Sequence, residues 1–144
     1  MKVLYDTSVL LAALLVGHTN HSLAFPQLKL ARRGMVQGYL STHSLAELYS
    51  VITRLPLPLR VAPDEAEAVI MDLLDYLEPI PLLVAEYQQS IRQMVALRLV
   101  GGGIFDAIIA QAALKAGVEQ ILTFNPKDFT RLGERVALLV QVPS

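Results

Sequence analysis

Acidic side chains stand at four points of the chain where a strand-like segment or a loop gives way to a helix-like one. Asp6 directly follows the short segment KVLY, and Glu47 lies early in the helix expected after the second strand. Asp106 follows three glycines at the start of a very apolar helix, and Asn125 to Asp128 form a predicted turn after the strand-like ILTF. In open parallel α/β sheets, ligands bind at the carboxyl ends of the strands, so these positions are the first candidates for chemistry.

Each of these groups also has a purely structural interpretation. Asp6 can cap the helix that begins at Thr7, and Ser44 to Glu47 match a capping box with Ser44 as the cap. Asp106 would complement a helix dipole, and Asn and Asp are common turn residues. Because all four groups are predicted to lie at strand ends or helix starts on one side of the sheet, a single shared site explains them better than four unrelated caps.

A cluster of carboxylates raises its own pKa values by mutual repulsion unless a divalent cation neutralises it. The chain has no cysteine, and we expect no chemistry from its three histidines, which lack the spacing of a zinc site: His18, His21 and His43. Oxygen ligands favour Mg²⁺ or Mn²⁺, which keep several waters and bind substrate phosphate. The pattern therefore indicates hydrolysis of a phosphodiester, with the metal polarising the phosphoryl oxygen.

Three further residues near the predicted site are candidate substrate contacts. Thr7 and Ser8 follow Asp6 directly and could hydrogen-bond a ligand carboxylate or the phosphate, although capping the first helix is the simpler role for each. Among the scattered basic residues, Lys127 is the favoured phosphate contact because it lies between Asn125 and Asp128.

The hydrophobic periodicity predicts strands and helices in alternation along the whole chain. Strands are expected at 2–5, 35–40, 119–123 and 136–142, with a short central strand around Pro79 and Pro81. Helices are expected at 7–15, 21–33, 41–55, 64–76, 84–99 and 104–116. Parallel strands need crossover connections, which are normally helical. The predicted fold class is therefore α/β, with three α/β/α layers around a mostly parallel central sheet.

Length and composition limit the possible classes of protein. A chain of 144 residues without internal repeats is expected to form one domain over residues 1–144. The longest apolar run, Val9–Val16, is too short to span a bilayer, and no signal segment precedes it, so we expect a cytoplasmic protein without membrane contact. With 53% hydrophobic residues, the chain is expected to bury a protein interface, either in a homodimer or with a bound partner.

Four short motifs occur in order along the chain: YDTS at 5–8, LAEL at 45–48, FDAIIA at 105–110 and TFNPKDF at 123–129. Together they resemble the successive signatures of PIN-domain nucleases, and in particular the VapC-type toxins of toxin–antitoxin modules. The resemblance spans essentially the whole chain. It implies a PIN-like fold, Mg²⁺- or Mn²⁺-dependent cleavage of RNA, and a small antitoxin protein that blocks the active groove.

The resemblance also assigns roles to individual residues. Asp6 and Asp106 would be direct metal ligands, and Glu47 would complete the site directly or through water. Asn125 occupies the place where many relatives have a fourth aspartate. Asp128 would compensate for this change or orient the turn, and the departure affects a second metal ion more than the first.

Other classes of α/β protein match the motifs of this sequence less well. An aspartyl phosphatase would typically carry a second Asp two residues after Asp6, where this chain has Ser8. A receiver domain needs an acidic pair after the first strand, and no G-x-S-x-G elbow, P-loop or dinucleotide loop is present. The remaining alternative is a catalytically weak PIN domain that acts as an RNA- or protein-binding scaffold, which Asn125 and a net charge of −1 would permit.

Overall fold

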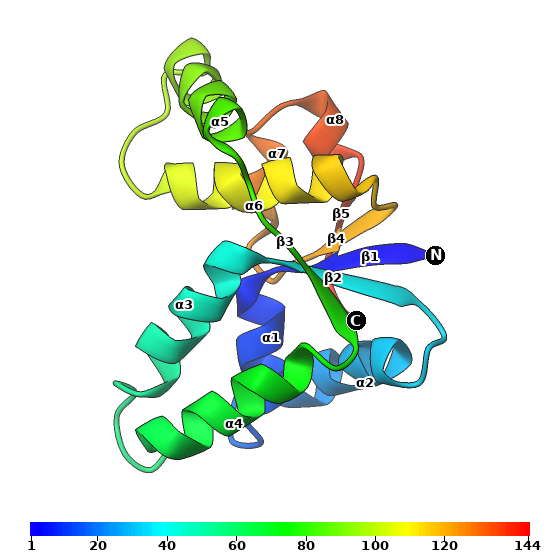
Figure 1. The fold of residues 1–144 in the computed structure, drawn as a ribbon, viewed down its shortest axis with the longest axis vertical. Helices are drawn as coiled ribbons and strands as arrows, with labels where there is room; N and C mark the ends of the chain where they lie inside the picture. The colour runs from blue at the N-terminus through cyan, green and yellow to red at the C-terminus, as the bar shows by residue number, and fades with distance from the viewer.

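The computed structural model covers residues 1–144 and has the predicted layered α/β architecture (Figure 1). The strands are β1 (Lys2–Tyr5), β2 (Gln37–Ser41), β3 (Leu77–Ile80), β4 (Gln120–Leu122) and β5 (Val140–Gln141). The helices are α1 (Thr7–Leu14), α2 (His21–Arg32), α3 (Thr42–Ile52), α4 (Pro63–Leu73), α5 (Val84–Ala96), α6 (Gly103–Ala116), α7 (Pro126–Thr130) and α8 (Glu134–Ala137).

All five strands are parallel and follow the order β3-β2-β1-β4-β5. Helices α1 to α4 cover one face of the sheet, and α5 to α8 cover the other (Figure 1). The side chains of β1 alternate between the two cores: Val3 and Tyr5 pack with the first helices, whereas Leu4 packs with α6. This period of two is what a strand buried on both faces requires. The predicted three-layer fold is confirmed.

Two predicted strands differ from the structure. The proline segment forms β3 at the edge of the sheet rather than at its centre, because Pro79 has no N–H to donate and an edge tolerates that loss. The last predicted strand, 136–142, is mostly not a strand: Val136 is buried from the short helix α8, and only Val140–Gln141 pairs with β4.

Helix α6 carries Asp106 in its first turn and lies close to the sheet. Its small residues Ala107, Ala110 and Ala113 are buried, which lets the helix backbone lie close to β2 and β3. Gly117 ends the helix in the left-handed conformation with φ 67°, a geometry that glycine adopts without strain. The position of Asp106 is therefore set by a rigid, tightly packed helix.

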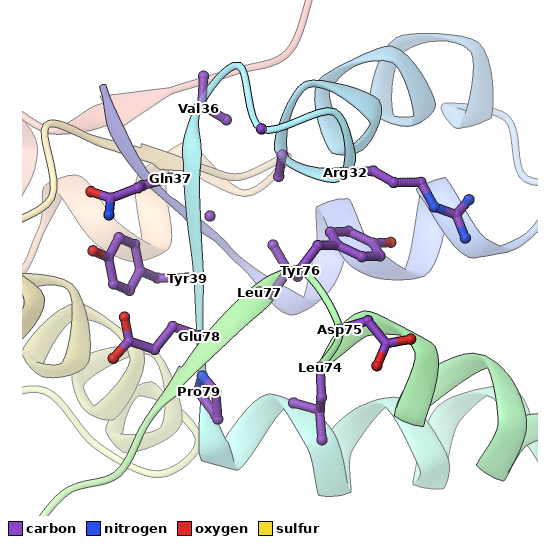
Figure 2. A pocket seen from close by; sticks show the side chains of 13 residues that line it. Arg32, Val36, Gln37, Tyr39, Leu74, Asp75, Tyr76, Leu77, Glu78 and Pro79 are labelled. Atoms are coloured by element: carbon purple, nitrogen blue, oxygen red, sulfur yellow. The ribbon is translucent and has the colours of Figure 1, made fainter.

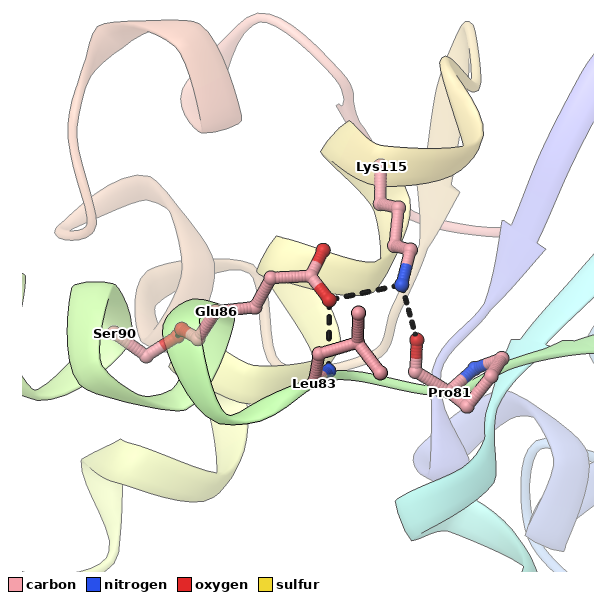
Figure 3. Close-up of polar contacts among 5 residues, drawn as sticks. All are labelled: Pro81, Leu83, Glu86, Ser90 and Lys115. Carbon is pink, nitrogen blue, oxygen red and sulfur yellow. Dashed lines mark hydrogen bonds and ion pairs between the residues drawn. The ribbon is translucent and has the colours of Figure 1, made fainter.

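A polar clasp holds the start of α5 against α6 (Figure 3). Glu86 Oε1 accepts hydrogen bonds from the Leu83 N–H and from Lys115 Nζ, each at 2.8 Å. Lys115 Nζ also donates to the Pro81 carbonyl at 2.8 Å. These bonds hold the pKa of Glu86 below its usual value, the Leu83 N–H contributing most. The clasp thus fixes the two helices of this layer relative to β3.

No helix of the protein is both long enough and apolar enough to cross a membrane.

Candidate active site

The acidic residues meet at the carboxyl ends of β1, β2 and β4. Strand β1 pairs with β2 on one side and with β4 on the other, so the chain reverses its direction of winding at β1. Such a switch point leaves a crevice beside the strand ends, where ligands of open α/β sheets bind. Asp6 follows β1 directly, and Thr123 follows β4.

Asp6 is held by hydroxyl groups rather than used as a helix cap. Its side chain is only 4% exposed and makes no capping bond to α1. Ser8 Oγ and Thr123 Oγ1 both donate to Asp6 Oδ2, at 2.7 and 2.8 Å. Burial raises the pKa of Asp6, and these two hydrogen bonds oppose the shift. The simple capping interpretation therefore does not account for this side chain.

Thr123 is a residue that the sequence did not single out as part of the site. It is fully buried, and besides binding Asp6 its Oγ1 accepts the N–H of Asn125 at 2.9 Å. Ser8 Oγ similarly accepts the Phe124 N–H at 3.0 Å. The two hydroxyls thus tie the segment after β4 to the carboxylate after β1. The sequence did contain one sign of this role: Thr123 is the first residue of the motif TFNPKDF and ends a predicted strand.

Glu47 projects from α3 and has His43 one turn before it. The helix is capped by Ser41, whose Oγ accepts the His43 N–H at 3.2 Å, so Ser44 is not the cap. Ser44 is instead buried inside α3, where its Oγ lies 2.8 Å from Thr7 Oγ1. The capping-box interpretation is therefore wrong, and Glu47 is free of that role.

His43 is part of the site, contrary to the expectation for the three histidines. Its Nε2 lies 3.5 Å from Glu47 Oε2, at the spacing of one helical turn. Its ring stacks on Phe105 with centroids 5.1 Å apart and planes inclined by 1°. His43 and Phe105 are far apart in sequence, so no local spacing could have predicted their contact.

Asp106 faces the other carboxylates from the first turn of α6. Burial raises its pKa from 3.8 to about 7, and Asp128, Asp6 and Glu47 push it in the same direction. Arg131 opposes this shift: its Nη2 lies 3.9 Å from Asp106 Oδ2. Burial is thus the main cause of the raised pKa of Asp106, and the neighbouring carboxylates add to it.

The predicted turn from Asn125 to Asp128 is instead the start of helix α7. Proline can occupy the first helical position without losing a hydrogen bond, and Pro126 does so here. The Asn125 side chain makes no capping bond. Asp128 acts on the site through its charge, by raising the pKa of Asp106. Lys127 lies on the exposed side of the helix.

These side chains surround one cavity of about 560 Å³. Its lining contains three carboxylates, one basic residue and one exposed aromatic ring, among Asp6, Thr7, Ser8, Leu11, His43, Ala46, Glu47, Ser50, Val51, Arg54, Phe105, Asp106 and Asn125. Asp128 and Lys127 are not among the lining residues. The predicted hydrogen bond from Ser8 to a site carboxylate is present, to Asp6, whereas the substrate contacts predicted for Thr7, Ser8 and Lys127 and the role of Asp128 stay predictions.

The donor set fits a hard divalent cation. Asp6, Glu47 and Asp106 come from three different elements and offer only oxygen atoms, the ligands that Mg²⁺ and Mn²⁺ prefer. No three Asp, Glu or His side chains converge closely enough to hold one ion. The carboxylates therefore share the cavity without forming a finished coordination site, and a cation bound among them would offset the cost of burying their charges.

A larger hollow, about 640 Å³, lies toward the amino ends of the strands, near the first residues of β2 and β3 (Figure 2). Its two carboxylates, Asp75 and Glu78, lie on opposite sides of the hollow. Its Arg32 is already paired with Asp72 at 2.9 Å. The acidic cavity, although smaller, is therefore the better candidate for catalysis.

Comparison with known proteins identifies the family of this chain. Residues 3–135 match the family model described as PIN domain. The chain is 32% identical over 114 residues to Ribonuclease VapC27 of Mycobacterium tuberculosis, covering 79% of this chain and 78% of that protein. It is 34% identical over 116 residues to Ribonuclease VapC40 of the same organism, covering 79% and 80%.

Solved structures share the fold at lower identity. The crystal structure of VapBC2 from Rickettsia felis bound to a DNA fragment from its promoter has a TM-score of 0.70 at 19% identity, with all of both chains covered. The Mycobacterium tuberculosis VapC20 toxin, which cleaves the sarcin-ricin loop, has a TM-score of 0.66 at 19% identity, with 83% of this chain and 86% of that chain covered.

Proposed function

We propose how this chain, which belongs to the PIN domain family and within it to the VapC ribonucleases, cleaves RNA. The reaction is endonucleolytic hydrolysis of a phosphodiester in the acidic cavity, with Asp6, Glu47 and Asp106 as the residues that hold a divalent cation. The observation that carries the proposal is that these three carboxylates, one directly after β1, one on α3 and one on α6, line one cavity at the switch point of the sheet.

A divalent cation bound there, Mg²⁺ or Mn²⁺, would supply Lewis acidity to the phosphoryl group. The chain itself orients the ligands. Ser8 and Thr123 fix one oxygen of Asp6, and His43 lies against Glu47. The hydrogen bonds to Asp6 would keep this proposed metal ligand in position and strengthen metal binding.

Two other residues that line the cavity bear on substrate binding and on the number of metal ions. Arg54 is the only Lys or Arg that lines the cavity, and we propose that it binds an RNA phosphate. Asn125 stands at the cavity with an amide in place of a carboxylate, which adds no negative charge there. The site therefore favours about one divalent ion per chain over two.

The test of this function is cleavage of a mixed pool of structured RNAs with Mg²⁺, with Mn²⁺ and with EDTA. Wild type is expected to cleave with either metal and not with EDTA, while Asp106→Asn is inactive in all three. Glu67→Gln, on the exposed surface of α4, is the matched control and should cleave like wild type. A folded wild type that cleaves nothing with either metal would favour the scaffold alternative.

We further propose that the chain is the toxin of a toxin–antitoxin pair and is held inactive by a small antitoxin protein. Exposed apolar side chains on α5, including Val84, Tyr87, Ile91 and Val95, support a buried protein interface. Their spacing places them along one side of the helix. Size-exclusion chromatography with light scattering tests this: a homodimer is expected for the chain alone, and co-expression with the neighbouring small reading frame should yield an inactive complex.

A further inference from the structure

Phe105 is an exposed aromatic ring at the edge of the acidic cavity. It is 47% exposed and immediately precedes Asp106 in the first turn of α6. Burying a phenylalanine side chain stabilises a protein, and this ring forgoes part of that gain. The ring lines the same cavity as Asp6 and Glu47, so it is available to a ligand bound beside those carboxylates.

The ring is held in a fixed plane. His43 stacks on one face of Phe105, with centroids 5.1 Å apart and planes inclined by 1°, which is an offset-stacked arrangement. His43 belongs to α3 and its Nε2 lies 3.5 Å from Glu47 Oε2. The ring orientation is therefore coupled to the element that carries one of the carboxylates.

The rest of the cavity runs along one side of α3. His43, Glu47 and Ser50 line it from α3, at spacings of three or four residues, and Arg54 lines it from just beyond the C-terminal end of the helix. One end of this run has the stacked Phe105, and the other has the exposed guanidinium of Arg54. A flat aromatic surface followed by a cation is the pattern with which proteins bind single-stranded nucleic acids.

We propose that Phe105, backed by His43, stacks on an unpaired base of the RNA beside the scissile phosphodiester, and that Arg54 holds a phosphate near the C-terminal end of α3. The inference rests on the proposed ribonuclease function. The neighbours of Phe105 in the cavity are mainly polar or charged, which suits a base next to a phosphate better than an apolar protein segment. Stacking tolerates any base, so the contact selects single-stranded RNA rather than a sequence.

The test compares RNA substrates that differ by one missing base. For an RNA that the wild type cleaves, abasic nucleotides are placed in turn on each side of the cleaved bond, and kcat/KM is measured with Mg²⁺. Loss of one stacked base costs about 1–3 kcal/mol, so one abasic position should lower kcat/KM about 5- to 150-fold in the wild type. Phe105→Leu should cleave the intact RNA and that abasic RNA with equal kcat/KM, whereas Phe105→Tyr should keep the wild-type difference between them.

Arg54→Gln serves as the contrasting variant. It should lower kcat/KM equally for intact and abasic RNA and reduce the slope of log(kcat/KM) against log[salt] by about 1. Melting temperatures of all variants show that they fold.

An abasic effect that persists in Phe105→Leu, or that no position shows in the wild type, would overturn the inference and leave Phe105 as a contact for a protein partner. A wild type that cleaves no RNA would instead overturn the proposed function itself, and the inference with it.

Discussion

Replacing Asp106 with asparagine should stabilise the metal-free protein at pH 8, although it removes a proposed metal ligand. Burial, Asp128, Asp6 and Glu47 raise the pKa of Asp106 from 3.8 to about 7. A carboxyl whose pKa is raised by folding binds its proton more tightly in the folded state. Its ionisation therefore costs stability, and the cost grows from pH 3.8 to about 7 and is complete above that.

The magnitude follows from the size of the shift. About three pKa units at ~1.4 kcal/mol each give an upper bound of ~4 kcal/mol. The Asp106 side chain is 26% exposed, so solvent screens part of this cost. The charge also gains about 0.3–1 kcal/mol from the N-terminus of α6, which asparagine forgoes. We expect a net stabilisation of ~1–2 kcal/mol, which corresponds to a rise in melting temperature of about 3–8 °C.

The assay is thermal unfolding of wild type, Asp106→Asn and the control Glu67→Gln in EDTA at pH 8 and pH 5. At pH 5 less than half of the electrostatic cost remains, so the advantage of the asparagine variant should shrink by at least half. The control should lie within about 0.5 kcal/mol of wild type at both pH values. An asparagine variant no more stable than wild type at pH 8, or one equally stabilised at both pH values, would refute the reasoning.

Three further predictions concern metal binding, the support of Asp6 and the packing of β2. Millimolar Mg²⁺ or Mn²⁺ at pH 8 should stabilise wild type by up to ~2.7 kcal/mol at a hundredfold excess over Kd, and so raise its melting temperature, but should not stabilise Asp106→Asn. Equal shifts in melting temperature would remove Asp106 from the ligand set. Thr123→Val should lower the cleavage rate about 10- to 100-fold, because Asp6 loses a hydrogen bond. Thr123→Ser keeps the hydroxyl and should cleave at the wild-type rate. A valine variant that also cleaves at the wild-type rate would contradict the role of Thr123 in holding Asp6. Gly38→Ala should destabilise the fold by ~1–3 kcal/mol in urea unfolding, because the new Cβ would lie 2.9 Å from Ala31 Cβ and would also overlap Leu77; unchanged stability would mean that β2 can shift.

Much of the fold could be predicted because its signals are local. The apolar segments 2–5 and 119–123, the helix starts after them and the glycine after Ala116 encode strands and helices through periodicity and turn chemistry. The misassigned segments have weak local signals. The residues 136–142 are apolar whether they form a helix or a strand, and only pairing with β4 shows that two of them are a strand.

The sequence by itself determined the chemical class of the candidate site. Without cysteine, and with Asp6, Glu47 and Asp106 at predicted strand ends or helix starts, the available chemistry was that of oxygen ligands and a hard cation. What only the tertiary structure decided is how those groups are held. Thr123 reaches Asp6 across 117 residues of sequence, and His43 meets Phe105 from another helix.

The physical reason is the range of the interactions. Caps and hydrophobic periods act between residues three or four apart, so each can be read from a short stretch of sequence. Hydrogen bonds such as that from Thr123 to Asp6, and the repulsion that raises the pKa of Asp106, exist only once the parallel sheet brings its strand ends together. Topology, rather than local sequence, therefore completes the site.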